Sequence, residues 1–436
     1  MCNYVCQFNR CCPVSTQEKS QRRWLNIIPR DFPLALVSIF SALSLSELVR
    51  GALTFSVLPT YGSGVLGLPV EITALAISLH YLMDTLFRTP FGWMIDRIGP
   101  RYPLMAGFVA ALCAVIFMFQ ARTGAMLLLA AMLFGFGVSP MWPAAMSAIA
   151  HRIEPQERAS YVGYLYLFWL CGTGLGPVLA NLLIARSYPA AFLALGLADG
   201  LGLLVVLLFV HNRQYRAHDS MRISNKYSWQ NRIQSILTNV REASYLFPGM
   251  FAQTFAITSL VPILSLYAKL ELHLSPIYYT GILVSGGALT ALTLIPAGKL
   301  VDRFGARYFL IFGFGTAAFA LIVFSFYHSR LATYLVVAFI GIAYGFVLPS
   351  WNKTVDTHID PDKKATLWGI FMTVEGIGSA VGPYVGGLVW QTLSPEAPFW
   401  VAGSVILLIC LLYIFVPLQK KDGGRESIRH RQRSTF

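Results

Sequence analysis

The sequence predicts an all-α membrane protein in which twelve transmembrane helices form two pseudo-symmetric bundles of six with the same topology. Of its 436 residues, 56% are hydrophobic and only 12% are charged. Soluble domains carry about 25% charged residues, so this composition favours a chain that lies in a bilayer. The chain also repeats itself at a constant offset of 206 residues. A repeat of this length indicates two homologous halves.

The repeat is clearest in one polar segment. The stretch GWMIDRIGPRY, which starts at Gly92, reappears as GKLVDRFGARY, which starts at Gly298. The offset pairs Asp96 with Asp302, Arg97 with Arg303, Gly99 with Gly305, and Arg101 with Arg307. It also carries Gly176-Pro177 onto Gly382-Pro383. Because the register holds without insertion over 61–183 and 267–389, the two halves form a parallel repeat.

Twelve apolar stretches have the length of about 20 residues that spans about 30 Å of hydrocarbon. In the first half they are 33–58, 70–95, 103–120, 125–150, 160–184 and 190–210. In the second half they are 245–267, 275–298, 308–327, 331–352, 366–390 and 398–417. We therefore expect an N-terminal tail at 1–32, a six-helix bundle at 33–210, a linker at 211–243, a second bundle at 244–417 and a basic tail at 418–436.

Basic residues predict the orientation, since Lys and Arg resist translocation. Of the 33 Lys and Arg residues, the turns of one side hold only Arg122, Arg186, Lys269 and Arg330. Both termini are therefore expected in the cytoplasm, with the chain in the cell membrane. The net charge of +13 then reflects topology and anionic lipid rather than nucleic acid. Four cysteines of the N-terminal tail are expected to be free thiols, namely Cys2, Cys6, Cys11 and Cys12.

Twelve helices in two parallel halves, with the turn Gly-x-x-x-Asp-Arg-x-Gly-x-Arg after the second helix of each half, resemble the major facilitator superfamily. The resemblance covers residues 33–417. It implies a secondary active transporter that works by alternating access, without a cofactor or metal, as a monomer. It also implies that the repeated turn is a cytoplasmic latch.

The chemistry of the turn fits a latch. Gly92 and Gly99 permit close approach and a tight turn, and Asp96 can accept hydrogen bonds from a helix N-terminus of the other half. Arg97 and Arg101 can face acidic residues such as Glu154. The second copy offers the same groups, namely Gly298, Asp302, Arg303, Gly305 and Arg307. A positive loop that only sets topology would account for the arginines but not for the two aspartates.

Small residues four apart mark the fifth and eleventh spans. Gly172, Gly176 and Pro177 lie in one, and Gly378, Gly382 and Pro383 lie in the other. Such residues let helices approach closely, and an interior proline bends a helix. The first motif is similar to the glycine-proline motif of drug/proton antiporters, although plain close packing explains it equally well.

Charged residues inside the membrane separate the two halves. The first span contains Glu47 and Arg50, and the second contains His80, Asp84 and Arg88. Their counterparts in the second half are uncharged, namely Gln253, Ala256, Gly286, Thr290 and Leu294. An isolated charge at mid-bilayer costs about 2.5–3.5 kcal/mol, so these groups should face each other. Two acids against Arg50 favour proton coupling over a static ion pair, and Arg88 is open between substrate contact, gate and structure.

The pattern Glu-x-x-Arg with Asp84 and Trp142 is similar to one branch of the superfamily, the proton-coupled glycolipid flippases of lipoteichoic-acid assembly. This resemblance implies that Glu47, Arg50 and Asp84 hold the headgroup or the proton, and that an apolar C-terminal half takes lipid tails. Glu375 departs from that pattern. An aromatic wall for substrate is also expected, although membrane aromatics often serve packing; its members are Trp142, Tyr166, Trp169 and Trp351.

The sequence therefore predicts a transporter rather than an enzyme. It contains no phosphate-binding loop of the type Gly-x-x-x-x-Gly-Lys-Ser/Thr, no His-Glu-x-x-His motif and no nucleophile elbow. We expect proton-coupled export or flipping of an amphipathic substrate such as a glycolipid. A drug/proton antiporter for small hydrophobic molecules and a non-transporting ligand sensor of the same fold are the alternatives.

Overall fold

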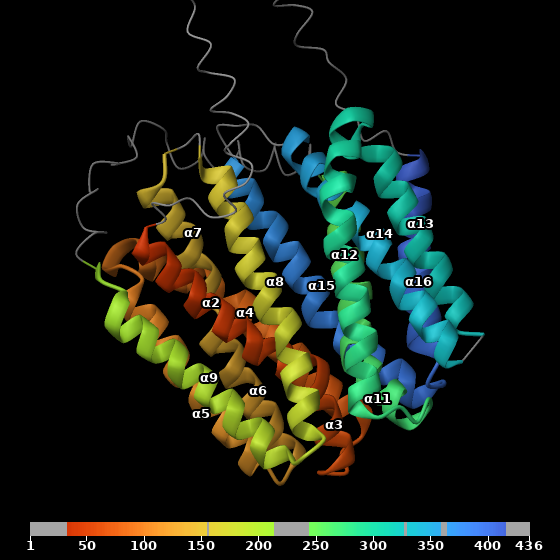
Figure 1. The fold of residues 1–436 in the computed structure, drawn as a ribbon, viewed down its shortest axis with the longest axis horizontal. Helices are drawn as coiled ribbons and strands as arrows, with labels where there is room; N and C mark the ends of the chain where they lie inside the picture. The colour runs from red at the N-terminus through yellow and green to blue at the C-terminus, as the bar shows by residue number, and fades with distance from the viewer. Residues whose placement is uncertain (1–32, 155–156, 213–243, 327–328, 359–363, 416–436) are drawn as a thin grey trace, which may run out of the picture.

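The computed structural model describes residues 33–154, 157–212, 244–326, 329–358 and 364–415, and within these ranges it is helical without strands (Figure 1). The expectations for the two tails, for most of the linker and for the four N-terminal cysteines lie outside the described residues.

The first half follows the expected spans closely. Its elements are α2 (Leu34–Ala52), η1 (Leu53–Val57), α3 (Leu58–Gly64), α4 (Val70–Ile98), α5 (Arg101–Gln120), α6 (Gly124–Val138), α7 (Met141–Arg152), α8 (Arg158–Ile184) and α9 (Tyr188–Phe209). Two spans differ from the expectation. The first continues to Gly64 through the π-helical turn η1, and the fourth is divided into α6 and α7 at Ser139 and Pro140.

The second half repeats this order. Its elements are η4 (Ser244–Leu246), α11 (Phe247–Leu270), α12 (Pro276–Phe304), α13 (Ala306–Phe324), α14 (Arg330–His358), α15 (Lys364–Thr392) and α16 (Ala397–Phe415). Eleven helices of the described ranges are long and apolar enough to cross a membrane. The twelfth long helix, α15, lies among them and packs against α11 and α4. The chain is therefore a multi-pass membrane protein.

The repeated glycines end two equivalent helices. Gly99 has a φ of 82° and terminates α4, while Gly305 has a φ of 92° and terminates α12. A side chain strains a backbone in this region, so both turns require glycine. We call the end of the molecule that carries these turns the latch end. The opposite end, with the turns 65–69 and 271–275, is the distal end.

Each half has its own hydrophobic core, and the halves meet nearer the distal end. The backbone N–H of Tyr384, which follows Pro383 in α15, donates to Ser78 Oγ of α4 at 2.8 Å. A proline loosens the helix around it, which makes this cross-half bond possible. Tyr279 Oη donates to the carbonyl oxygen of Phe55 at 3.5 Å. The helices α3 and α11 also lie side by side there (Figure 1).

Toward the latch end, α4 loses this cover. Leu86 is 55% exposed and Trp93 is 56% exposed, whereas Ala74 and Ile77, nearer the distal end, are fully buried. The hydrogen bonds at Ser78 and Phe55 therefore join the two halves nearer the distal end.

Candidate functional site

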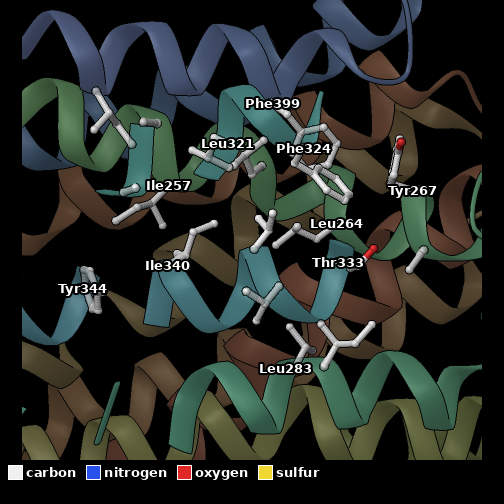
Figure 2. A pocket seen from close by; sticks show the side chains of 18 of the residues that line it. Ile257, Leu264, Tyr267, Leu283, Leu321, Phe324, Thr333, Ile340, Tyr344 and Phe399 are labelled. Carbon is white, nitrogen blue, oxygen red and sulfur yellow. The ribbon is translucent and has the colours of Figure 1, made fainter. Parts of the chain in front are cut away.

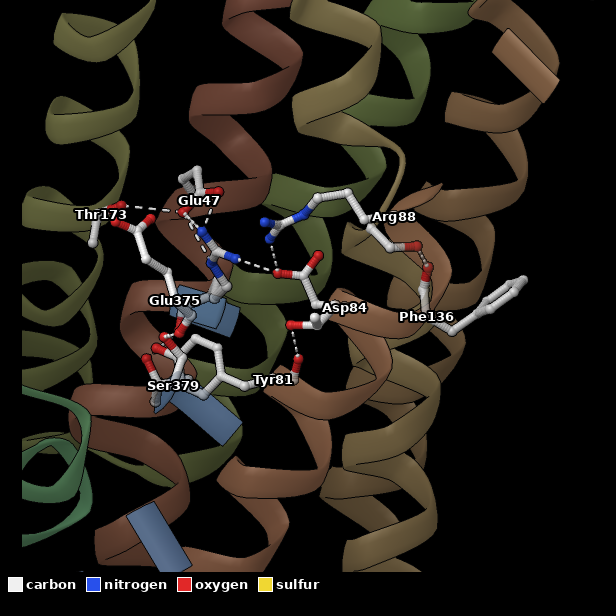
Figure 3. Close-up of polar contacts among 12 residues, drawn as sticks. Glu47, Tyr81, Asp84, Arg88, Phe136, Thr173, Glu375 and Ser379 are labelled. Carbon is white, nitrogen blue, oxygen red and sulfur yellow. Dashed lines mark hydrogen bonds and ion pairs between the residues drawn. The ribbon is translucent and has the colours of Figure 1, made fainter. Parts of the chain in front are cut away.

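Four charged residues of α2 and α4 form a buried network, which we call the ion-pair cluster (Figure 3). Arg50 approaches Glu47 with two nitrogens, at 2.5 Å from Nη2 to Oε1 and 3.0 Å from Nε to Oε2. Its Nη1 donates to Asp84 Oδ2 at 3.1 Å. The same oxygen accepts from Arg88 Nη2 at 2.7 Å. Helical spacing explains the arrangement, because residues three or four apart share a helix face.

The cluster contains two acids and two bases. Glu47 is 5% exposed and Asp84 is 4% exposed, so both carboxylates are removed from water and require partners. The prediction of a surplus acid in the first two spans is wrong, because Arg88 supplies a second base. Arg88 therefore pairs with Asp84 in this conformation, and its role as substrate contact, gate or structural partner stays a prediction.

A third carboxyl lies in the second half. Gln253 Nε2 of α11 donates to Glu375 Oε1 of α15 at 3.3 Å, and the indole of Trp351 also faces this carboxyl. Thr173 Oγ1 of α8 donates to Glu47 Oε2 at 3.2 Å in the first half. Gln253 is the repeat counterpart of Glu47, so both halves join their first and fifth helices by a polar contact.

Glu375 lies close to the cluster but does not pair with it. A Cβ built on the adjacent Gly376 would lie 2.5 Å from Thr85 Oγ1, which places this turn of α15 directly against α4. Arg88, Tyr166 and Tyr344 are near enough to interact electrostatically with the Glu375 carboxylate. No ion pair of Glu375 occurs among the described residues. Glu375 is thus the surplus acid of the central region.

His80 lies outside the ion-pair cluster. It is 1% exposed and stacks on Phe134 of α6, with ring centroids 5.2 Å apart. Neither ring nitrogen has a hydrogen-bond partner in the described part of the chain. His80 is near enough to interact electrostatically with Arg50 and Asp84, although no hydrogen bond or ion pair joins it to them in the described part of the chain, so its place in the central polar site stays a prediction.

The predicted aromatic wall is divided between the halves. Tyr166 contacts Trp142 and Trp169 edge to face, with centroid distances of 5.4 and 6.2 Å. Trp351 instead lies in the core of the second half, 4% exposed, beside Tyr413. Three of the four residues therefore form one aromatic group.

An apolar cavity of about 230 Å³ occupies the second half (Figure 2). Its labelled lining includes Ile257, Leu264, Tyr267, Leu283, Leu321, Phe324, Ile340 and Phe399. Gln253 and Tyr344 also line it, which connects the cavity to the surroundings of Glu375. Phe55 of η1 is a lining residue from the first half. The resemblance to the glycolipid flippase branch implied an apolar C-terminal half, but it did not indicate these individual residues.

The latch residues make their described contacts within their own halves. Arg101 Nη2 donates to the carbonyl oxygen of Leu207 at 3.0 Å, and Arg307 Nη2 donates to that of Ile414 at 2.7 Å. Asp302 pairs with Lys353 at 3.1 Å. Arg97 lies over the Trp93 ring, 3.9 Å from its centroid. The contacts of Arg97 and Arg101 expected at Glu154 are not among those described.

The glycines of the fifth and eleventh spans pack helices inside each half. A Cβ on Gly172 or Gly176 would overlap a carbonyl oxygen of α2, at Ser44 or Leu48 respectively. A Cβ on Gly378 or Gly382 would likewise overlap a hydroxyl oxygen of α11, at Thr254 or Thr258 respectively. These motifs are therefore close-packing motifs in this conformation.

Known proteins share both the sequence and the fold. Residues 39–383 and 246–435 match the model of the Major Facilitator Superfamily. The proton-coupled antiporter flippase LtaA of Staphylococcus saprophyticus is 30% identical over 403 residues, which covers 90% of this chain and 96% of that protein. LtaA of Staphylococcus aureus strain USA300 is 28% identical over 405 residues, which covers 91% of this chain and 97% of that protein.

Solved structures agree on the architecture. A mutant of the nucleoside transporter NupG superposes with a TM-score of 0.71 at 12% identity and covers 88% of this chain and 100% of that one. A POT family transporter in complex with a thioalcohol conjugated peptide superposes with a TM-score of 0.69 at 14% identity and covers 88% of this chain and 96% of that one. At this identity the two structures establish the fold alone. With two matched halves, twelve long helices and the duplicated Asp-Arg-x-Gly turn, the chain belongs to the Major Facilitator Superfamily.

Proposed function

We propose that the chain is a proton-coupled antiporter that moves an amphipathic, lipid-like substrate such as a glycolipid between leaflets. One observation carries this proposal: the apolar cavity of the second half reaches Gln253, whose partner Glu375 lies near Arg88 of the ion-pair cluster in the first half. A polar headgroup matches the ion-pair cluster and an acyl chain matches the apolar cavity. The name of the LtaA relatives, proton-coupled antiporter flippase, supports the same assignment.

The latch end is assigned to the cytoplasm by the distribution of basic residues. Each bundle, at 33–210 and 244–417, crosses the membrane six times, so its two ends lie on the same side. The N-terminal tail, the linker 211–243 and the tail 418–436 are therefore all placed in the cytoplasm. In this orientation the hydrogen bonds between the halves lie nearer the outer end, which fits the state of alternating access that opens to the cytoplasm. The protein acts as a monomer in the cell membrane, and as a transporter rather than an enzyme.

Proton coupling uses the ion-pair cluster together with Glu375. Glu47 and Asp84 are held by Arg50 and Arg88, whereas Glu375 has only neutral hydrogen-bonding neighbours. When the halves rock, Arg88 can exchange Asp84 for Glu375, because both carboxylates lie near it. When Arg88 moves to Glu375, Asp84 loses a positive partner and can take up a proton, while Glu375 gains that partner and can release one. Proton binding is thereby linked to the direction in which the cavity opens.

The test is a flipping assay in proteoliposomes with a fluorescent glycolipid that an external reductant quenches. The expected result is that a pH gradient increases the protected fraction of labelled lipid, and that collapsing the gradient with an ionophore removes the increase. Failure of lipid movement combined with drug-dependent proton release would move the assignment to drug/proton antiport. The apolar cavity and the glycine-proline motif of α8 favour that second candidate. A sensor would show saturable ligand binding without movement in either assay.

A further inference from the structure

A second cavity, distinct from the central site, lies between the halves at the distal end. We call it the distal polar pocket, and it measures about 190 Å³. Its polar lining comes from both halves: Thr60, Asn181 and Tyr188 from the first, and Ser265, Lys269 and Tyr279 from the second. The share of liquid volume of one water molecule is about 30 Å³, so the pocket has room for a small polar group.

Two of these side chains are buried without a partner. Asn181 is 4% exposed and Ser265 is 3% exposed. Neither Asn181 Nδ2 nor Ser265 Oγ has a hydrogen-bond partner in the described ranges. A buried donor left unmatched costs about 1–3 kcal/mol, and here one from each half lines the same pocket. This juxtaposition indicates a ligand, because two such groups would otherwise oppose closure of the distal end.

The charge of the lining selects the ligand class. Lys269 is the one charged residue of the pocket lining, and no acidic side chain lines it. Lys269 reaches across the interface, since a Cβ built on Gly64 of α3 would lie 3.2 Å from Lys269 Nζ. Ammonium, amide and hydroxyl donors that converge on one small pocket suit an oxyanion.

We propose that the distal polar pocket is a binding site for an oxyanion of the phosphate class, supplied by free phosphate or by a lipid headgroup. Because the site is built from both halves, occupancy holds the distal end closed. An oxyanion on the outer side then stabilises the conformation that is open to the cytoplasm, by binding this state in preference to the other. The site goes beyond the proposed transport function, which needs no ligand at this position.

The test uses the purified full chain in phosphatidylcholine nanodiscs, with sodium phosphate compared against sodium chloride at equal ionic strength. The expected result is a saturable rise in Tm of about 2–4 °C, with slower amide hydrogen exchange in the turns 64–69 and 270–276. Lys269→Gln, Asn181→Ala and Ser265→Ala should each reduce both effects, and Lys269→Arg should keep them. Lys299→Gln is the matched control, since Lys299 is exposed on α12 and does not line the pocket.

Nanodiscs that contain phosphatidylglycerol distinguish the two sources. If a lipid headgroup occupies the pocket, these discs raise Tm and slow the amide exchange of the two turns without added phosphate, and Lys269→Gln removes both effects. If free phosphate is the ligand, the phosphate effect is the same in both lipids. The proposal is overturned if neither phosphate nor anionic lipid acts on the wild type, or if all variants respond as the wild type does.

Discussion

Asp84 is the carboxylate that both arginines of the cluster contact. Its neutralisation therefore tests directly whether the cluster takes part in proton coupling. In Asp84→Asn, Arg88 loses the partner 2.7 Å away and Arg50 loses one of its two partners. Breaking a buried ion pair by removing one member costs about 3–5 kcal/mol. At about 2 °C per kcal/mol, Tm should fall by about 6–10 °C.

The double variant Asp84→Asn/Arg88→Gln separates stability from transport. Removing the second charge restores the balance of the cluster, so we expect Tm to recover to within about 2 °C of the wild type. Gradient-driven transport should remain absent, because the titratable group is still missing. Asp302→Asn is the control for the Tm measurement alone: this aspartate also forms an ion pair, but its side chain is 79% exposed, and an exposed pair contributes about 0–1 kcal/mol.

Both quantities are measured on the same preparations, Tm by thermal unfolding in detergent and uphill transport in proteoliposomes with an imposed pH gradient. Recovery of uphill transport in the double variant would refute the coupling role and leave Asp84 as a structural anchor. An unchanged Tm in Asp84→Asn would refute the view that the cluster is desolvated.

Three further predictions concern packing, the third carboxyl and the latch. Gly172→Ala should lower the stability of the protein by about 1–3 kcal/mol because its Cβ overlaps α2, whereas Gly174→Ala, with open space around it, should be neutral or stabilising; equal Tm values would contradict the packing model. Glu375→Gln should abolish uphill transport but preserve downhill movement, and full retention of uphill transport would remove Glu375 from the coupling scheme. Asp96→Ala should slow turnover about threefold to tenfold with unchanged substrate affinity, and normal turnover would argue against the latch.

The fold was largely predictable from the sequence because a constant offset and apolar length constrain it strongly. The glycines at 99 and 305 also marked helix ends correctly, since their positive φ is a local requirement. The break between α6 and α7 had a visible signal, because Pro140 and Pro143 interrupt the fourth apolar stretch. The π-helical turn η1 also had a local signal, because Pro59 follows it and has no N–H to donate to the carbonyl oxygen of Phe55, four residues before.

The central site was predictable only in part. Spacing within each helix puts Glu47 on one face with Arg50 and Asp84 on one face with Arg88, but the contact between Arg50 and Asp84 depends on how α2 crosses α4, and spacing within one helix cannot give this. Asp199 was missed altogether, although an acid in the middle of the apolar span α9 is itself a signal. It is fully buried, and neither carboxylate oxygen has a partner within the described ranges.

The relation between the two halves explains why α15 matters for coupling. The ion-pair cluster lies entirely on α2 and α4, so its protonation alone does not distinguish the two openings of the transporter. A conformational equilibrium shifts only through contacts that differ between its states. The closest such contact near the cluster is α15, which packs Gly376 on Thr85 and carries Glu375. We therefore propose that α15 links protonation near the cluster to the motion of the two halves, so substitutions in α15 should alter coupling while the cluster itself stays intact.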